Sequence, residues 1–477
     1  MAFNLLLENL YKQSIYFGFD ITNEKEDIFN NKLHGVPFVE PLVIKRDVKY
    51  LIKKDIKFIY PISAVDENVF NNPPFKLRPQ VIDRCKKGFC KVGIMHDTEG
   101  QSNVDKVMLL LWLDSFAMLN ELDGSNFFFA HGDRKLRQTY EDIRKGREFN
   151  KEPLVNILKY SYFENFPWFT QPDANRVSLN NEELLEHAVN VINNSRSVKK
   201  EKYFLCLNRV LRLPRLLIFG AIATNPDLVQ KTILSIGKNQ TGFGSLNQNL
   251  TSTELSNFLP DRIADYVRSY DFDNPKHILD NPDNSNKAFG INIDFHQSTF
   301  LNIVTETLHR NDTMFFSEKI FKPMYMFQPF ILVGNPNSLK ELHQMGYKTF
   351  SKWWDESYDE EKDLVKRVLM IEKLLMKLSK LSTDDLFKIT QEMEETLIHN
   401  FNRYLFDIKQ ETLDYLNFFT MQDPAPPEQV EIFKLHTLGE KIELKSYNKI
   451  IKRNYCSDGK SNIDDSWARQ QFKEINK

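Results

Sequence analysis

Three residues in one short stretch could together hold a ligand. Ser317 can cap a helix, which places Glu318 and Lys319 in the first helical turn. The run PFILVG that follows is apolar throughout, as strands covered on both faces are, and it ends at Gly334. The stretch predicts a carboxylate and an ammonium at the edge where open parallel sheets bind ligands. The alternative is structural, with Glu318 favouring the helix dipole and Lys319 simply solvated.

A second stretch, YFLCLNRVLRLPRLLIFGAI, carries arginines suited to an anion. An apolar strand leads into a loop with Arg209 and Arg212, and Pro214 suits the first position of a helix, with Arg215 next. A helix N-terminus with added guanidinium groups can bind an anion, and a diphosphate is the obvious candidate. Surface salt bridges are the alternative.

A third run, TFLNIVTE, delivers Glu306 to the carboxyl end of an apolar strand. A carboxylate there could accept hydrogen bonds from ribose hydroxyls, as acids do in nucleotide-binding folds. It could also cap the turn that follows.

These residues require parallel sheets with crossover helices to position them. Apolar runs of strand length alternate with helical stretches in both halves of the chain, which predicts two α/β lobes. We expect lobes at residues 1–180 and 200–355, helices over 356–440 that brace the two lobes, and a polar tail at 441–477. The expected strands include IKFIYPI, KVGIM, FFFAH, ILKYSYF, YFLCLN, KTILSIG, TFLNIVTE and PFILVG.

Helix boundaries are also readable in the second half. Ser338 and Glu341 predict a capping box, and Gly346 stands where that helix should stop. Apolar residues from Leu364 step by four and three, which is typical of a core-facing helix. A second helix should begin at Ser382.

Composition excludes several classes of protein. The 477 residues include 63 Lys and Arg against 65 Asp and Glu, so the chain lacks the global positive field of a non-specific nucleic-acid binder. The four cysteines are too few and too scattered for a disulfide framework or a structural zinc site. No apolar run is long enough to span a bilayer and no signal peptide is recognisable, so we expect a cytosolic protein that binds no membrane.

The order of these motifs resembles the donor lobe of the α1,3-fucosyltransferase family. That family has a strand with Phe-Glu-Asn, a Thr-Glu-Lys helix and a Val-Pro-led strand, and this chain has VTET at 304–307, SEK at 317–319 and QPFILVG at 328–334. The resemblance covers about 140 residues. Thr307 stands where the family usually has Asn, and the donor base and sugar stay open. The chain also looks like proteins of large bacteriophages and other viruses.

The resemblance implies a GT-B glycosyltransferase with two Rossmann-like lobes facing a cleft. The first lobe would hold the acceptor and the second the nucleotide sugar, with no cofactor beyond that co-substrate. Lys319 and Arg215 would neutralise the donor diphosphate, while Glu306 and Glu318 would contact the ribose or base. Arg209, Arg212 and Ser317 would complete the donor site.

Departure of a nucleoside diphosphate builds negative charge, which Lys and Arg can stabilise without a metal. A carboxylate on the opposite lobe would then take the proton of the acceptor hydroxyl. Glu99 in HDTEG is our first choice, because Gly100 allows a tight turn, and Asp97 is the second. His131 and Asp133 in AHGD are alternatives.

Two other readings stay open. A metal-dependent GT-A transferase would need an Asp-x-Asp site, for which Asp271 and Asp273 in SYDFDNPKH are the candidates. A viral protein that binds a sugar or nucleotide without turnover is the other. The acceptor could be a hydroxymethylated DNA base, a glycan, a protein or a small metabolite.

Overall fold

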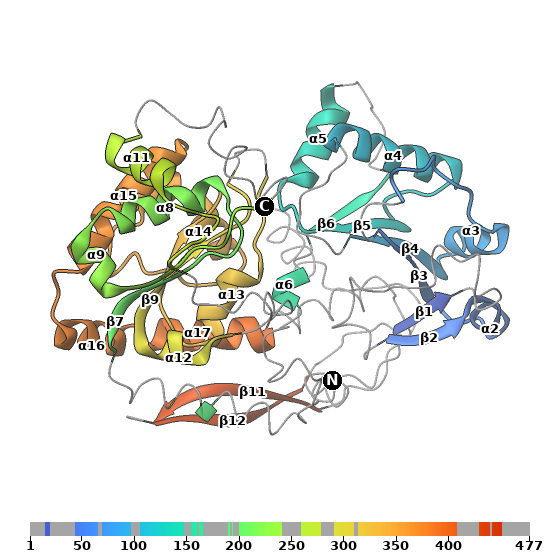
Figure 1. Ribbon diagram of the computed structural model, residues 1–477. Coiled ribbons are helices and arrows are strands. Elements are labelled where there is room, and N and C mark those ends of the chain that lie inside the picture. Colours follow the sequence, from blue (N-terminus) through green and yellow to red (C-terminus); the bar gives the residue numbers. More distant parts are fainter. Residues whose placement is uncertain are drawn as a thin grey trace.

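The computed structural model of the chain contains two parallel sheets, each flanked by helices, and a separate antiparallel hairpin. Figure 1 shows the first sheet on the right and the second on the left, so the predicted α/β class with parallel sheets is confirmed. The predicted lobe boundaries stay a prediction. The structure describes residues 15–19, 43–64, 69–96, 105–146, 154–159, 162–165, 189–190, 193, 200–240, 259–277, 291–309, 313–407, 429–438 and 441–450.

The first sheet has six parallel strands in the order β2-β1-β3-β4-β5-β6. Its interior is closely packed: a Cβ added at Gly93 would lie 2.2 Å from the ring of Phe128 on the neighbouring strand. The strands are β1 (Ile15–Phe19), β2 (Val43–Asp47), β3 (Phe58–Ser63), β4 (Cys90–Met95), β5 (Phe127–His131) and β6 (Asn156–Lys159). The helices are α2 (Val48–Lys53), α3 (Pro79–Lys86), α4 (Lys106–Leu119), α5 (Leu136–Gly146) and α6 (Tyr162–Asn165).

The second sheet has four parallel strands in the order β10-β9-β7-β8. All residues of β9 and β10 are buried, as expected for strands covered on both faces. The strands are β7 (Lys202–Leu207), β8 (Thr232–Ser235), β9 (Thr299–Thr305) and β10 (Phe330–Val333). The helical segments are α8 (Leu213–Ala223), α9 (Pro226–Lys231), α11 (Asp261–Ser269), α12 (Ile293–Ser298), α13 (Glu318–Tyr325), α14 (Ser338–Gln344) and η5 (Ser357–Glu360).

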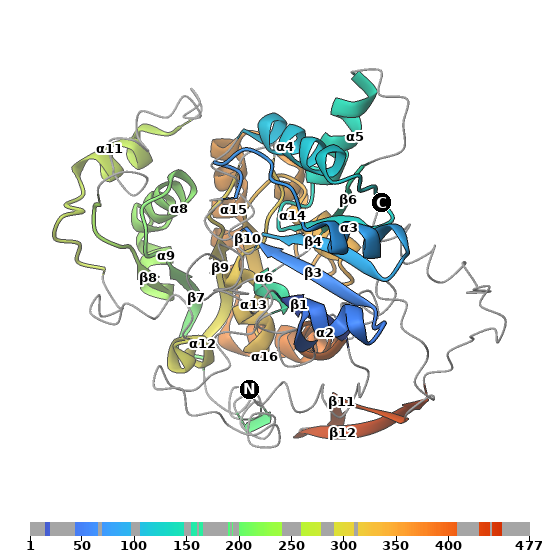
Figure 2. The same ribbon diagram turned by 90° about the vertical axis from the view of Figure 1, so that its right-hand side faces the viewer.

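The two lobes share part of their apolar core. Ile59, Phe128, Ala130 and Phe163 of the first lobe pack into the cluster that fills the second lobe. The rest of the first lobe has a core of its own around β3, β4 and α4. Figure 2 looks from the first-lobe side, with β3 and β4 in front of β9 and β10.

Three helices follow the second sheet, α15 (Leu364–Leu378), α16 (Thr383–Glu392) and α17 (Glu394–Asn402), and the chain continues into a π-helical turn, η6 (Arg403–Asp407). The starts of α15 and α16 are as predicted, and Ser382 forms a capping box. Tyr203 donates to the carbonyl of Leu381 at 2.7 Å, and α15 packs on α8 and α9. These contacts join the helices to the second lobe, so their role in bracing both lobes stays a prediction.

The expected polar tail at 441–477 is corrected in part. β11 (Gln429–Leu438) and β12 (Lys441–Ile450) pair antiparallel, with Leu438 opposite Lys441. Apolar Ile442 and Leu444 alternate with charged neighbours, and this period of two suits a strand although the segment is polar overall. The hairpin also corrects the helical expectation for the end of 356–440.

The start of α14 differs from the predicted capping box. Asn337 precedes the helix at a φ of 64°, and Ser338 donates to the carbonyl of Asn335 at 2.6 Å. Asp359, distant in sequence, accepts from the N–H groups of Leu339 (3.0 Å) and Lys340 (3.3 Å). A tertiary partner therefore does the capping, which local spacing did not predict. The predicted stop is confirmed, with Gly346 at a φ of 85°.

Within the described ranges, no helix has both the length and the apolar character needed to cross a bilayer. The expected cytosolic location stays a prediction.

A buried polar network lies where β9 begins. Gln328 accepts from Nδ1 of His296 at 2.8 Å and donates to Oγ1 of Thr299 at 2.8 Å. Burial lowers the pKa of His296 to about 4, with Lys322 and Lys200 acting in the same direction and the Gln328 hydrogen bond opposing them. The histidine is therefore neutral in the folded protein at neutral pH.

The stabilisation from neutral His296 should be lost as the pH falls. The unfolded chain takes up a proton near pH 6.5 while the folded histidine resists it down to about pH 4. We expect the wild-type advantage over His296→Gln in unfolding free energy to shrink across that range, by up to about 1.4 kcal/mol per pH unit. Urea unfolding at several pH values measures this difference. A difference that does not change with pH would contradict the assignment, and His343→Gln controls for replacing an exposed histidine.

Candidate functional site

The carboxyl edges of the two sheets meet at a junction of loops. Arg134, which follows β5, donates its N–H to the carbonyl of Met314 at 2.8 Å, and Met314 lies between β9 and α13. Lys159, the last residue of β6, lies 3.9 Å from Glu341 of α14, which follows β10. Arg134 forms a second ion pair with the same glutamate. Residues that follow strands in both sheets are thus in contact, and carboxyl edges are where parallel sheets bind ligands.

Glu306 and Ser317 form the anchor of α13 at this junction. The Glu306 side chain lies at the carboxyl end of β9 and is 1% exposed. It accepts from the N–H of Ser317 at 3.2 Å and from its hydroxyl at 2.5 Å. Ser317 in turn accepts from the N–H of Lys319 at 3.3 Å, so the predicted cap is confirmed. A strand end and a helix start are joined through one buried carboxylate.

The carboxylate of Glu306 has the contacts of a cap rather than of a free acceptor. Both of its oxygens are engaged by Ser317. Burial raises its pKa, while the charge of Lys319 and the hydrogen bonds from Ser317 act in the opposite direction. The cap alternative thus accounts for these contacts, and a contact of Glu306 with ribose stays a prediction.

Lys319 provides the accessible charge beside this anchor, next to the buried Glu318. Nζ of Lys319 lies 2.9 Å from Glu318 and 3.2 Å from the hydroxyl of Ser317, and its side chain is 26% exposed. Burial raises the pKa of Glu318, but Lys319 and Lys322 together with hydrogen bonds outweigh this, so the net pKa lies below the ordinary value. The helix start therefore presents an ammonium whose position is set by two neighbours.

The arginines lie one strand away, after β7. Arg209 is exposed, Arg212 immediately precedes α8, and Pro214 lies in its first turn as predicted. Arg215 of α8 is buried and donates to the carbonyl of Val210 in the preceding loop at 2.9 Å. The structure thus brings Glu306, Ser317, Glu318 and Lys319 together and places the arginines on the adjoining strand end. A shared diphosphate site for Arg215 and Lys319 stays a prediction.

Three residues that the sequence did not single out hold this edge in place. Asn208 directly follows β7 and accepts a hydrogen bond from the hydroxyl of Thr305, the last residue of β9. Polar residues that end two adjacent buried strands are the signal that could have indicated this pair. Arg367 of α15 is 1% exposed and donates to the carbonyl of Gly334 and, at 2.8 Å, to that of Glu361. It fixes the end of β10, and no local pattern points to it.

The structure describes only two of the four candidate bases of the first lobe. Asp97 and Glu99 lie outside the described residues. Asp133 is 1% exposed, lies 2.6 Å from the ammonium of Lys106, and accepts two backbone N–H groups. His131 is equally buried, and burial together with His96 and Lys106 lowers its pKa well below the ordinary value. The contacts of these two residues are those of structural groups, and a role for either as the base stays a prediction.

Asp271 has the contacts of a turn residue. Its carboxylate accepts from the N–H groups of Asp273 and Asn274, both at 3.1 Å. Among the described residues, no group of three metal-binding side chains gathers.

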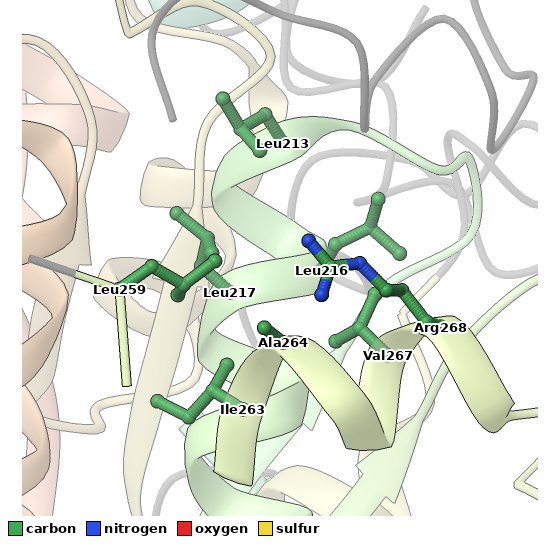
Figure 3. A pocket seen from close by; sticks show the side chains of 8 residues that line it. All are labelled: Leu213, Leu216, Leu217, Leu259, Ile263, Ala264, Val267 and Arg268. Atoms are coloured by element: carbon green, nitrogen blue, oxygen red, sulfur yellow. The ribbon is translucent and has the colours of Figure 1, made fainter. Parts of the chain in front are cut away.

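A small apolar hollow lies between α8 and α11 (Figure 3). Figure 3 shows its lining side chains, which come mainly from facing turns of the two helices: Leu213, Leu216, Leu217, Leu259, Ile263, Ala264, Val267 and Arg268. The two helices pack closely beside it, since a Cβ added at Gly220 would lie 2.8 Å from the side chain of Ile263. The hollow offers few polar groups to orient a nucleotide.

Comparison with known proteins gave no family profile that matches the chain and no matching curated sequence. A crystal structure of an α1,3-fucosyltransferase aligns with a TM-score of 0.34 and 9% identity, over 89% of this chain and 98% of that chain.

Removing the Glu306 carboxylate should destabilise the protein. Glu306→Ala leaves the N–H of Ser317 buried without its acceptor, which should cost about 1 to 3 kcal/mol of unfolding free energy. Urea unfolding measures this cost. Glu306→Gln keeps one oxygen as an acceptor and is the matched control, so it should cost less. An alanine variant as stable as the glutamine variant would contradict the anchor role.

Proposed function

We propose that the protein is a glycosyltransferase that moves a sugar from a nucleoside diphosphate to an acceptor hydroxyl. One observation carries the proposal: two parallel sheets meet at their carboxyl edges, and one edge carries a capped helix start with Glu318 and Lys319. Parallel α/β sheets bind ligands at their carboxyl edges. Where two such edges meet, one sheet can bind the donor and the other can bind the acceptor. A GT-B arrangement of the lobes is the reading that fits.

The second lobe would bind the donor. Lys319 is the favoured contact for the diphosphate, because its ammonium stands at the positive end of α13 and its side chain is partly exposed. Glu318 would accept from a ribose hydroxyl or the base. Arg215 would add charge from the first turns of α8, with Arg209 and Arg212 on the loop that precedes this helix.

The negative charge that builds up on the leaving nucleoside diphosphate determines the reaction that we propose. As the nucleoside diphosphate leaves, Lys319 and Arg215 would stabilise its growing negative charge without a metal ion. Glu99, or Asp97 in its place, would take the proton of the acceptor hydroxyl as the oxygen attacks the anomeric carbon. Direct displacement from the opposite face inverts the anomeric configuration. The acceptors we propose to test are a glycan and a hydroxymethylated base of phage DNA.

Replacing Lys319 should weaken nucleotide binding. Losing a charge-assisted contact to phosphate costs on the order of 1.5 to 3 kcal/mol, so the dissociation constant of Lys319→Ala should rise roughly tenfold to 150-fold. Thermal shift with UDP, GDP, ADP and CDP identifies the base that binds, and calorimetry with that nucleotide then compares the variants. Lys380→Ala, an exposed lysine at the end of α15, is the control. Unchanged affinity of Lys319→Ala would contradict its assignment as the diphosphate contact.

Transfer should be independent of metal and dependent on Glu99. With the matching nucleotide sugar, EDTA should leave the rate unchanged, while Glu99→Gln should lower it roughly 10²-fold or more at near-normal donor affinity. The anomeric configuration of the product shows whether the reaction inverts.

Loss of activity with EDTA and rescue by manganese would favour a metal site at Asp271 and Asp273 instead. Nucleotide binding without hydrolysis or transfer would favour a binding protein.

A further inference from the structure

We infer that Asp133 of the first lobe is a positioning residue for the donor helix α13 of the second lobe. The inference rests on the proposed function, because it assigns a role toward the site at Ser317–Lys319. Asp133 touches none of the proposed donor contacts itself. It acts through the backbone of Met314.

Asp133 connects three elements through one buried carboxylate. It follows β5 and accepts at Oδ1 from the N–H groups of Met314 and Lys135, both at 3.0 Å. Its Oδ2 lies 2.6 Å from Nζ of Lys106, the first residue of α4. The Asp133 N–H donates to Nδ1 of His131 at 2.9 Å, which fixes the turn. A carboxylate with this set of donors cannot shift without leaving one of them unpaired in the interior.

Met314 is held by the first lobe at both of its backbone groups. Its N–H donates to Asp133, and its carbonyl accepts from the N–H of Arg134. Its side chain is 3% exposed, and its sulfur lies 3.8 Å from the hydroxyl of Ser338 of α14. Ser317, the cap of α13, follows three residues later, and the intervening Phe315 and Phe316 are each 1% exposed. Because this link is short and buried, the hydrogen bond between Asp133 and Met314 restricts where Ser317 and Lys319 can lie.

Two anchors therefore place the start of α13. Glu306 holds it to its own sheet, and Asp133 holds the preceding segment to the other sheet. Loss of the second anchor should loosen Ser317–Lys319 relative to the first lobe and lower the affinity for a diphosphate.

Asp133→Asn tests this role most directly. An asparagine oxygen can still accept from Met314, but its amide then directs a donor at the ammonium of Lys106. Asp114→Asn is the matched control. Asp114 is a buried carboxylate in the same lobe that accepts from Tyr140 at 2.5 Å and from Arg144 at 3.1 Å, and these contacts join α4 to α5.

The test combines hydrogen exchange with nucleotide binding on the full chain. We expect Asp133→Asn to speed amide exchange over residues 314–319 by about tenfold or more and to weaken binding of the matching nucleoside diphosphate by a similar factor. Asp114→Asn should change neither beyond its effect on overall stability. Lys106→Met, which acts on the same carboxylate, should shift both readouts in the direction of Asp133→Asn and serves if that variant fails to fold.

The outcomes separate the inference from the proposed function. Unchanged exchange over 314–319 overturns the inference whatever the nucleotide result. Faster exchange with unchanged nucleotide affinity overturns the positioning role toward the donor. A wild-type protein that binds none of the four nucleoside diphosphates overturns the proposed function, and selective exchange in Asp133→Asn then still supports the link from Asp133 to α13.

Discussion

Burial of carboxylates where two parallel sheets meet is the constraint on which the rest of this structure depends. A charged carboxylate removed from water is costly unless donors fill its lone pairs. Glu306, Asp133 and Asp359 satisfy this requirement with backbone N–H groups from segments distant in sequence. Each such contact fixes a loop that would otherwise be free to move. Hydrogen bonds to these buried carboxylates therefore order the junction, together with apolar packing.

These contacts make the helix starts of the second lobe depend on their surroundings. α13 is capped locally by Ser317, but Ser317 itself is held by Glu306 of β9. α14 is capped by Asp359, and burial raises the pKa of that carboxyl to about 6 against the opposing effect of its backbone donors and of Arg367. A helix start fixed in this way presents its N–H groups and first-turn side chains at a defined place. Preorganised donors of this kind favour binding of an anion because little ordering remains to be done.

The same constraint separates charges that serve the fold from charges that remain available. Arg367 and Asp133 are buried, and they contact loop carbonyls, backbone N–H groups and one lysine. Lys319 keeps about a quarter of its side chain exposed beside its two partners. The accessible ammonium at the end of this network is the reason that a diphosphate is the ligand we favour. Arg209 and Arg212 lie in the loop that follows β7, and β7 pairs with β9 in the same sheet.

The sequence by itself determined the local elements, because hydrophobic period and capping chemistry act over a few residues. The runs PFILVG and TFLNIVTE indicated buried parallel strands, Ser317 and Ser382 indicated helix starts, and Gly346 indicated a helix end. The motif at 317–319 was found in this way, since its residues are neighbours in the chain.

Only the tertiary structure decided which distant groups satisfy one another. Glu341 was expected to cap its own helix, yet it pairs with Arg134 of the other lobe, and Asp359 takes the capping role. Asp133 was a candidate base, yet its carboxylate accepts from the N–H groups of Met314 and Lys135 and forms an ion pair with Lys106. Neither outcome is encoded in local spacing. Both follow from desolvation at the junction, which exists only after the two sheets have come together.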